Sequence, residues 1–292
     1  MDLRSLSVFV EVVRRGGFTA ASAKVALTQP SISRVIKQLE DDVGQVLITR
    51  QHRAIVPTEA GKILYRHAQN LLRDHAALET EMADLAGLRR GLLTLGIPPL
   101  SGTLFVPLIK RYKERYPDIE LILYEKGSKA TEKALLGADM QLGTLILPLD
   151  TALYESVPVF QDRLALAAAL DSPWAQRESV RLSELRDEAF IIFPEDFALN
   201  DTVRNACSQA GFEPEIAASS SHFSFIAGLI ESRVGIALLP LSVVRNTNSV
   251  AVITLEDPVV EWNIAIAWCR DFYLSHAAQA MVELVKAYPL GA

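Results

Sequence analysis

Near the N-terminus, apolar positions recur at helical spacing in two short segments separated by a tight turn. Thr19 is a favoured N-cap for a first helix over residues 20–26, and Thr28 is one for a second helix that tolerates Pro30 in its first turn. The inward positions of the second helix are apolar: Ile32, Val35, Ile36 and Leu39. Its opposite face is polar and carries Gln29, Ser31, Ser33, Arg34, Lys37 and Gln38.

After Gly44 an alternating pattern over 47–50 and 53–56 predicts two short strands, so the segment has the elements of a winged helix-turn-helix. In that geometry the second helix enters the major groove of double-stranded DNA. Arginine pairs with guanine and glutamine with adenine, whereas serine and lysine suit phosphates. The alternative is an ordinary solvated surface. The predicted DNA contacts are Gln29, Ser31, Ser33, Arg34 and Lys37 on the helix, with Arg50 and Arg53 in the wing.

A third helical pattern has a narrow apolar seam. Its positions step by four and three in alternation, which is typical of a two-stranded coiled coil. The alternative is a helix that packs on its own domain. His75 is expected to be a tolerated polar residue on this seam. The seam consists of Leu64, Ala68, Leu71, His75, Leu78, Met82 and Leu85.

From Leu92 the pattern becomes α/β. A strand over 92–97, a helix over 103–116 and a strand over 119–125 predict a parallel strand-helix-strand unit. Further elements are predicted as strands in 189–194, 235–239 and 263–268 and as helices in 201–210 and 223–232.

Composition adds the cellular setting and the charge distribution. Half of the 292 residues are hydrophobic, yet no apolar run is long enough to span a membrane and no signal-peptide pattern begins the chain. We therefore expect a cytoplasmic protein with no membrane partner. The net charge is −6, but residues 1–90 are net +3 and all the excess acid lies beyond them. Because this basic charge is mild, we expect tight binding to need two or more of the N-terminal winged helix-turn-helix segments, called heads below, on one DNA.

The residues that carry chemistry in enzymes are not arranged for it. The five histidines show no metal-ligand spacing, and there is no nucleophile elbow or phosphate-binding glycine loop. Cys207 and Cys269 are isolated, so we expect buried free thiols. We predict no catalytic residues, no metal and no cofactor. A solute-binding protein is a second alternative, which the missing signal peptide and the N-terminal head oppose.

The head combines, at fixed spacing, a set of apolar, glycine and polar residues: Leu6, Phe9, Gly17, Phe18, Thr19, Ala20, Ala21, Gln29, Pro30, Ser31, Ile32, Ser33, Ile36, Leu39, Glu40, Gly44, Leu47, Arg50, Thr58, Ala60 and Gly61. This order of residues closely resembles the N-terminal domain of LysR-type transcriptional regulators. Farther along, the motifs at 116–119, 211–214 and 235–240 match recurring marks of the same family, while Gln141 stands where the family often has Asp.

The resemblance implies three parts. These are a mainly α-helical winged helix-turn-helix domain over 1–60, a linker helix with a hinge over 61–91, and an effector domain over 92–292 that is two-lobed, α/β and similar to periplasmic binding proteins. Lobe one would comprise 92–161 and 266–292, and lobe two 162–265. The resemblance also implies self-association as a dimer or tetramer and DNA binding that responds to a small effector.

Effectors of this fold bind between the lobes, at strand C-termini and helix N-termini. Three groups of loops in this chain fit that position, although helix capping is an equal explanation for each hydroxyl residue. A small carboxylate or other organic anion is the expected ligand. The candidate effector-binding residues are Ser101, Gly102, Thr103, Gly127, Ser128, Phe193, Thr202, Ser221 and His222.

Overall fold

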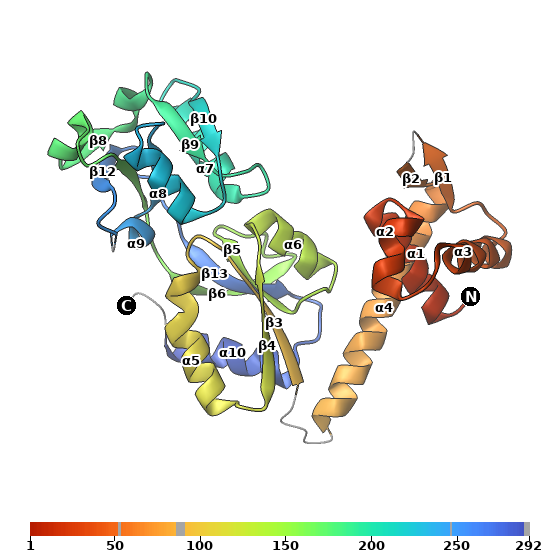
Figure 1. The fold of residues 1–292 in the computed structure, drawn as a ribbon. Helices are drawn as coiled ribbons and strands as arrows, with labels where there is room; N and C mark the ends of the chain where they lie inside the picture. Colours follow the sequence, from red (N-terminus) through yellow and green to blue (C-terminus); the bar gives the residue numbers. More distant parts are fainter. Residues whose placement is uncertain (52–53, 86–90, 246, 289–292) are drawn as a thin grey trace. The chain divides into compact units, whose positions relative to one another are not determined.

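The computed structural model describes residues 1–51, 54–85, 91–245 and 247–288 of the chain. Backbone contacts divide it into two compact units, Met1–Ala86 and Gly87–Ala292, each with its own core (Figure 1). In the described part of the chain no helix is both long and apolar enough to cross a membrane.

The N-terminal unit packs three short helices and a two-stranded wing against the start of a long helix. Buried side chains from all of these elements form its core, among them Phe9, Ile32, Leu39, Leu47 and Ala68. The predicted winged helix-turn-helix is therefore confirmed. Its elements are α1 (Leu3–Arg15), α2 (Phe18–Val25), α3 (Gln29–Val43), the antiparallel strands β1 (Ile48–Gln51) and β2 (Ala54–Pro57), and α4 (Glu59–Leu85).

Local capping explains most of these boundaries. Thr28 caps α3 by accepting a hydrogen bond from the Ser31 amide at 3.4 Å, and α3 ends at Gly44, whose φ of 71° suits glycine. The prediction that Thr19 caps α2 is wrong. The Gly17 carbonyl already accepts the first helical bond from the Ala21 amide, so α2 begins at Phe18 and Thr19 lies inside it.

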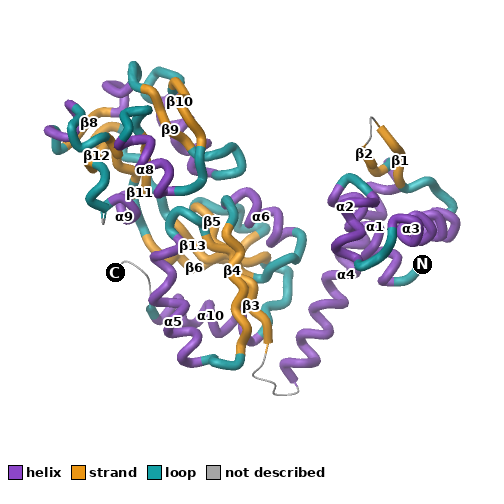
Figure 2. Tube along the Cα trace, in the orientation of Figure 1, coloured by secondary structure: helices purple, strands orange, loops and turns teal. Residues whose placement is uncertain are grey.

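Lobe one of the second unit is built on a five-stranded sheet in the order β4-β3-β5-β13-β6. Strand β3 is parallel to β4 and β5, which confirms the predicted strand-helix-strand unit, and β13 is antiparallel to both neighbours. Helices α5 and α10 contact each other, while α6 contacts β5 and β13 (Figure 2). The bounds are β3 (Gly91–Ile97), β4 (Ile119–Glu125), β5 (Leu142–Ile146), β6 (Tyr154–Phe160), β13 (Ile264–Cys269), α5 (Val106–Arg115), α6 (Ser128–Leu136) and α10 (His276–Ala287).

Gln141, which stands where the resembled family often has Asp, has a structural role here. The side-chain oxygen of Gln141 accepts hydrogen bonds from the Ser275 hydroxyl at 2.6 Å and the Ser275 amide at 3.3 Å. Ser275 in turn is the N-cap of α10, where its hydroxyl accepts from the Ala278 amide. Gln141, directly before β5, therefore holds the start of the last helix, α10, against the start of that strand.

Lobe two contains a four-stranded sheet, β11-β7-β12-β8, and a parallel pair, β10-β9. An isolated bridge between Phe190 and Ile236 links the pair to the larger sheet. The two chain connections between the lobes run side by side, joined by a bridge between Arg163 and Glu261. The bounds in lobe two are β7 (Leu164–Ala168), β8 (Ser179–Arg181), β9 (Ala189–Ile192), β10 (Glu215–Ser219), β11 (Ala237–Pro240), β12 (Ala251–Asp257), α7 (Ala198–Gln209), α8 (Phe223–Glu231), α9 (Leu241–Val244) and the 3-10 turns η2 (Pro173–Gln176) and η3 (Leu182–Leu185). A further 3-10 turn, η1 (Gly102–Phe105), precedes α5 in lobe one.

Candidate functional site

Helix α3 presents a polar face to solvent. Ile32, Ile36 and Leu39 are buried in the head, which turns the opposite side of the helix outward. Ser31 differs from the other predicted contacts because it is only half exposed and its hydroxyl lies 2.9 Å from that of Thr28, within the helix cap. The exposed members of this face are Gln29, Ser33, Arg34, Lys37 and Gln38.

The wing is fixed to α3 and α4 by two polar side chains. Glu40 accepts hydrogen bonds from the amides of Leu47 at 2.8 Å and Ile48 at 3.3 Å, where the chain enters β1. Thr58 donates to the Val46 carbonyl at 2.7 Å and accepts from the Gly61 amide in the first turn of α4. This bonding sets the wing beside α3. Arg50 lies on β1, and Arg53 falls outside the described residues.

Helix α4 divides into a packed half and an exposed half. Ala68 is buried in the core of the head and Leu64 packs against that core. This first half of α4 therefore packs on its own domain, which was the alternative to a coiled coil. Farther along the same seam the side chains of Leu71, Leu78 and Met82 are 48%, 57% and 59% exposed. The second half of α4 therefore carries an uncovered apolar seam.

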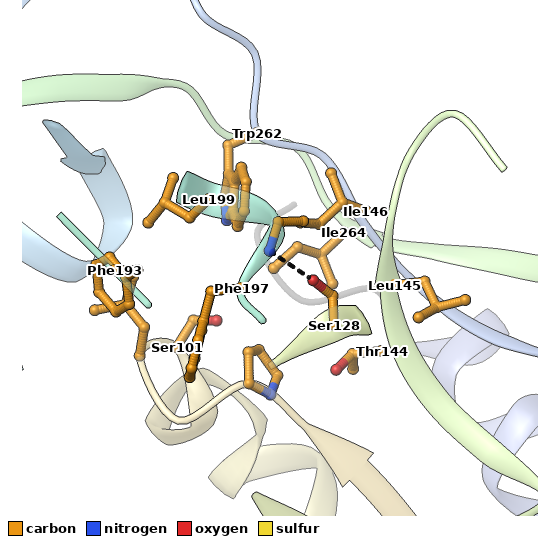
Figure 3. Close-up of a pocket in the computed structure, with 13 residues that line it drawn as sticks. Ser101, Ser128, Thr144, Leu145, Ile146, Phe193, Phe197, Leu199, Trp262 and Ile264 are labelled. Atoms are coloured by element: carbon orange, nitrogen blue, oxygen red, sulfur yellow. Dashed lines mark hydrogen bonds between the residues drawn. The ribbon is translucent and has the colours of Figure 1, made fainter. Parts of the chain in front are cut away.

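The second unit contains a pocket between its two lobes, close to where the chain crosses between them (Figure 3). It is a narrow space of about 420 Å³, part of it continuous with solvent. None of its lining side chains is ionisable. Lobe one contributes Pro98, Leu100, Ser101, Ser128, Thr144, Leu145, Ile146 and Ile264, lobe two contributes Phe193, Phe197, Ala198 and Leu199, and Trp262 comes from the second connection.

Three of the nine predicted effector residues line this pocket: Ser101, Ser128 and Phe193. Thr202 is one turn into α7, where its hydroxyl donates to the Ala198 carbonyl at 3.1 Å, and His222 is the exposed N-cap residue of α8. The remaining predicted residues, Gly102, Thr103, Gly127 and Ser221, are likewise not among the lining residues.

Thr144, Ile264 and Trp262 also line the pocket but were not predicted from the sequence. The first two lie inside or at the start of apolar strands that read as core, and the third stands in a connection without a recognisable motif. Only their place in the sheet order, beside the crossing between the lobes, brings them to the pocket.

Contacts across the cleft hold the lobes together at this point. The Ser128 hydroxyl, at the start of α6, accepts a hydrogen bond from the Ala198 amide, at the start of α7, at 3.2 Å (Figure 3). The Lys129 ammonium lies 2.7 Å from the Asp201 carboxylate and donates to the Glu195 carbonyl. Because the first residues of two helices line the pocket, the positive ends of two helix dipoles meet there.

The described residues contain no group of three or more His, Cys, Asp or Glu side chains that could hold a metal ion. Neither cysteine forms a disulfide within the described residues, and both are buried. Burial, with a smaller effect of nearby Glu213, raises the pKa of the Cys207 thiol to about 11. Only about one Cys207 side chain in a thousand would then be the reactive thiolate at pH 8.

We therefore expect the Cys207 thiol to be inert in the folded protein. With 5,5′-dithiobis(2-nitrobenzoate) at pH 8, Cys207 should react at least about a hundredfold more slowly in the native protein than in denaturant, because burial limits both access and ionisation. A Cys207→Ser variant assigns the signal by separating it from that of Cys269. Rapid reaction of native Cys207 would contradict the expectation.

Comparison with known proteins matches both units. Residues 3–62 match the family described as bacterial regulatory helix-turn-helix protein, lysR family, and residues 86–289 match the LysR substrate binding domain. The chain is 35% identical over 291 residues to the uncharacterized HTH-type transcriptional regulator YwbI of Bacillus subtilis (strain 168), covering 99% of this chain and 97% of the relative.

Solved structures agree on the fold. A full-length OxyR variant from Pseudomonas aeruginosa has a TM-score of 0.71 at 23% identity, covering 98% of this chain and 95% of that one. The effector binding domain of QuiR in complex with shikimate has a TM-score of 0.62 at 20% identity, covering 68% and 97%. These structures and the family matches confirm the predicted fold class, and the family matches with the relative YwbI confirm the prediction that the chain is not an enzyme. The chain belongs to the LysR family of DNA-binding transcriptional regulators.

Proposed function

We propose that this regulator changes its DNA binding or bending when a small organic anion, such as a carboxylate, occupies the pocket between the lobes. The observation that carries the proposal is the meeting of the first residues of α6 and α7, Ser128 and Ala198, at one pocket. Helix N-termini favour negative charge, and the hydroxyls of Ser101 and Ser128 add neutral donors. The bound shikimate of QuiR, a cyclic carboxylate, is a precedent in a protein of the same fold.

Coupling to DNA requires that the ligand bind two arrangements of the protein with different affinity. Contacts such as Ser128 with Ala198 and Lys129 with Asp201 join the lobes beside the pocket. A ligand that touches both lobes strengthens or weakens the closed arrangement, and this supplies the differential affinity.

The test is a footprint of the purified protein on the DNA upstream of its own gene and the neighbouring gene, at fixed salt. Protection should cover an interrupted inverted repeat, and its pattern should change on addition of an acid that gives heat in calorimetry. If no acid in a panel of short mono- and dicarboxylates gives heat, the proposal of an organic anion as effector is rejected. If an acid binds but leaves the footprint unchanged, the proposed coupling between effector and DNA binding is rejected.

We also propose that the exposed half of α4 pairs with a second copy of the chain, giving a dimer or tetramer. Leu71, Leu78 and Met82 repeat at the spacing of a coiled-coil seam and stand in solvent in the single chain. Pairing two heads would add their phosphate contacts on one DNA, which the mild charge of each head favours.

Leu78→Ala should weaken self-association about tenfold or more, because each subunit loses part of a buried leucine at the seam. Sedimentation velocity over a concentration series measures the change. Ile63→Ala is the matched control, since Ile63 is 56% exposed on the same helix but lies off the seam. Equal behaviour of the two variants would exclude this seam as the pairing surface.

A further inference from the structure

Trp262 lines the pocket with an indole N–H that is buried and unpaired within the described part of the chain. It is 5% exposed, and its indole Nε1 makes no hydrogen bond with any described residue. Buried donors are nearly always paired, and an unpaired one is costly. Because Trp262 lines the pocket, a bound ligand would supply the acceptor that the described residues do not.

The rest of the wall is mainly apolar. The rings of Phe193 and Phe197 lie 5.4 Å apart, and Leu199, Ile146 and Ile264 add aliphatic surface. No lysine, arginine or histidine lines the pocket, so hydroxyl groups spread over a ligand would find few partners. Burial of such hydroxyls without partners opposes binding. The wall therefore favours an apolar body with few polar atoms.

The polar groups of the wall lie in separate places. Trp262 is set apart from Ser128 and from Thr144 in the pocket (Figure 3). The Thr144 hydroxyl already donates to the Gly96 carbonyl at 3.0 Å, and the Ser128 hydroxyl already accepts from the Ala198 amide. Ser128 and the first residues of α6 and α7 therefore lie in one part of the wall, and Trp262 lies in another.

We propose that the effector is a compact, mainly apolar organic acid with a second hydrogen-bond acceptor, which accepts a hydrogen bond from Trp262 Nε1. Trp262 then determines specificity by selecting that acceptor. The inference rests on the proposed function, because the carboxylate occupies the helix N-termini, and it narrows the ligand from any organic anion to one with an apolar body.

The test compares three six-membered-ring carboxylates by calorimetry on the full-length protein: cyclohexanecarboxylate, 4-oxocyclohexanecarboxylate and shikimate. The first two share an apolar body and differ in a ketone acceptor. The ketone should tighten binding by roughly two- to tenfold, the usual range for one net hydrogen bond. Shikimate, with three hydroxyls on its ring, should bind more weakly than either.

Trp262→Phe removes the donor and keeps a ring, so it should bring the affinity ratio of the ketone to the plain acid close to one. Trp268→Phe is the matched control, because Trp268 lies on β13 outside the pocket wall, and the ratio should persist there. The comparison in the unmodified protein holds even where the Trp262 variant fails to fold.

The outcomes separate the two proposals. Heat from shikimate alone would overturn this inference and leave the proposed function standing. Equal affinity for the two apolar acids, or a ratio unchanged in Trp262→Phe, would overturn the role of Trp262 and again spare the proposed function. No heat from any acid, including the short-acid panel, would overturn both.

Discussion

Replacing Gly61 with alanine should lower the melting temperature of the N-terminal unit by roughly 8 °C or more and abolish specific DNA binding. A Cβ atom at this position would stand 2.0 Å from the Leu47 carbonyl oxygen and 3.1 Å from the Pro57 Cβ. Overpacking typically costs about 1–3 kcal/mol, with the upper end expected where backbone must shift, and 1 kcal/mol moves the melting temperature of a domain this size by about 4–8 °C. The gain in helix propensity from glycine to alanine, about 1 kcal/mol, is smaller.

The contact matters because Leu47 enters the wing and Thr58 ties that same segment to α4. A shift at Gly61 therefore moves the wing relative to α3. Calorimetric melting with a fluorescence-anisotropy titration on the protected DNA measures both effects.

Gly228→Ala is the control, since Gly228 is also helical and a Cβ there meets nothing within 4 Å. That variant should melt at the same temperature or slightly higher. A Gly61→Ala protein with unchanged melting and DNA affinity would show that the close approach does not exist in solution.

Replacing Arg34 with alanine should weaken binding to the protected DNA by about 5- to 150-fold, which corresponds to about 1–3 kcal/mol. Arg34 is exposed on the face of α3 opposite the buried Ile32 and Ile36, and the guanidinium has the two parallel donors that a guanine edge accepts. Binding to unrelated DNA should change far less. Anisotropy titrations on both DNAs at one salt concentration give the specificity ratio.

Two variants sharpen this test. Arg34→Lys keeps the charge but loses the paired donors, so specificity should fall while non-specific binding is retained. Lys37 lies one turn farther along the same exposed face. Lys37→Ala should weaken binding to both DNAs alike and reduce the slope of log affinity against log salt concentration by about one. If Arg34→Ala weakens binding to both DNAs equally, Arg34 contacts phosphate and does not contact a base edge.

The head was predictable because its signals are local. Thr28, Pro30 and Gly44 mark the two ends of α3, and the apolar spacing between them selects the buried face. The predicted start of α2 was wrong because threonine is a favoured N-cap by residue type alone. The extended backbone of Gly17 makes Gly17 the N-cap, so the helix begins earlier, at Phe18. The α4 pattern was ambiguous for a physical reason: the same seam packs on the head at Ala68 and stands free at Leu78.

The pocket was predictable only in part. Ser101, Ser128 and Phe193 follow strands and precede helices, and such positions converge at the end of an α/β sheet. Thr202 has an equally suitable hydroxyl, but that hydroxyl donates its hydrogen bond to the Ala198 carbonyl within α7. Trp262 and Thr144 reach the pocket through the order of strands β5 and β13 in the sheet, which no local pattern encodes.

The hydrogen bond from the Ala198 amide to the Ser128 hydroxyl exists only while the two lobes are apposed. The first amide of a helix otherwise has no partner within the helix, so it exchanges its proton with solvent readily. This single amide is therefore a built-in gauge of cleft opening. Its deuterium uptake reports the fraction of time the lobes spend apart, and a compound that closes them would slow that uptake before any effect on DNA is measured.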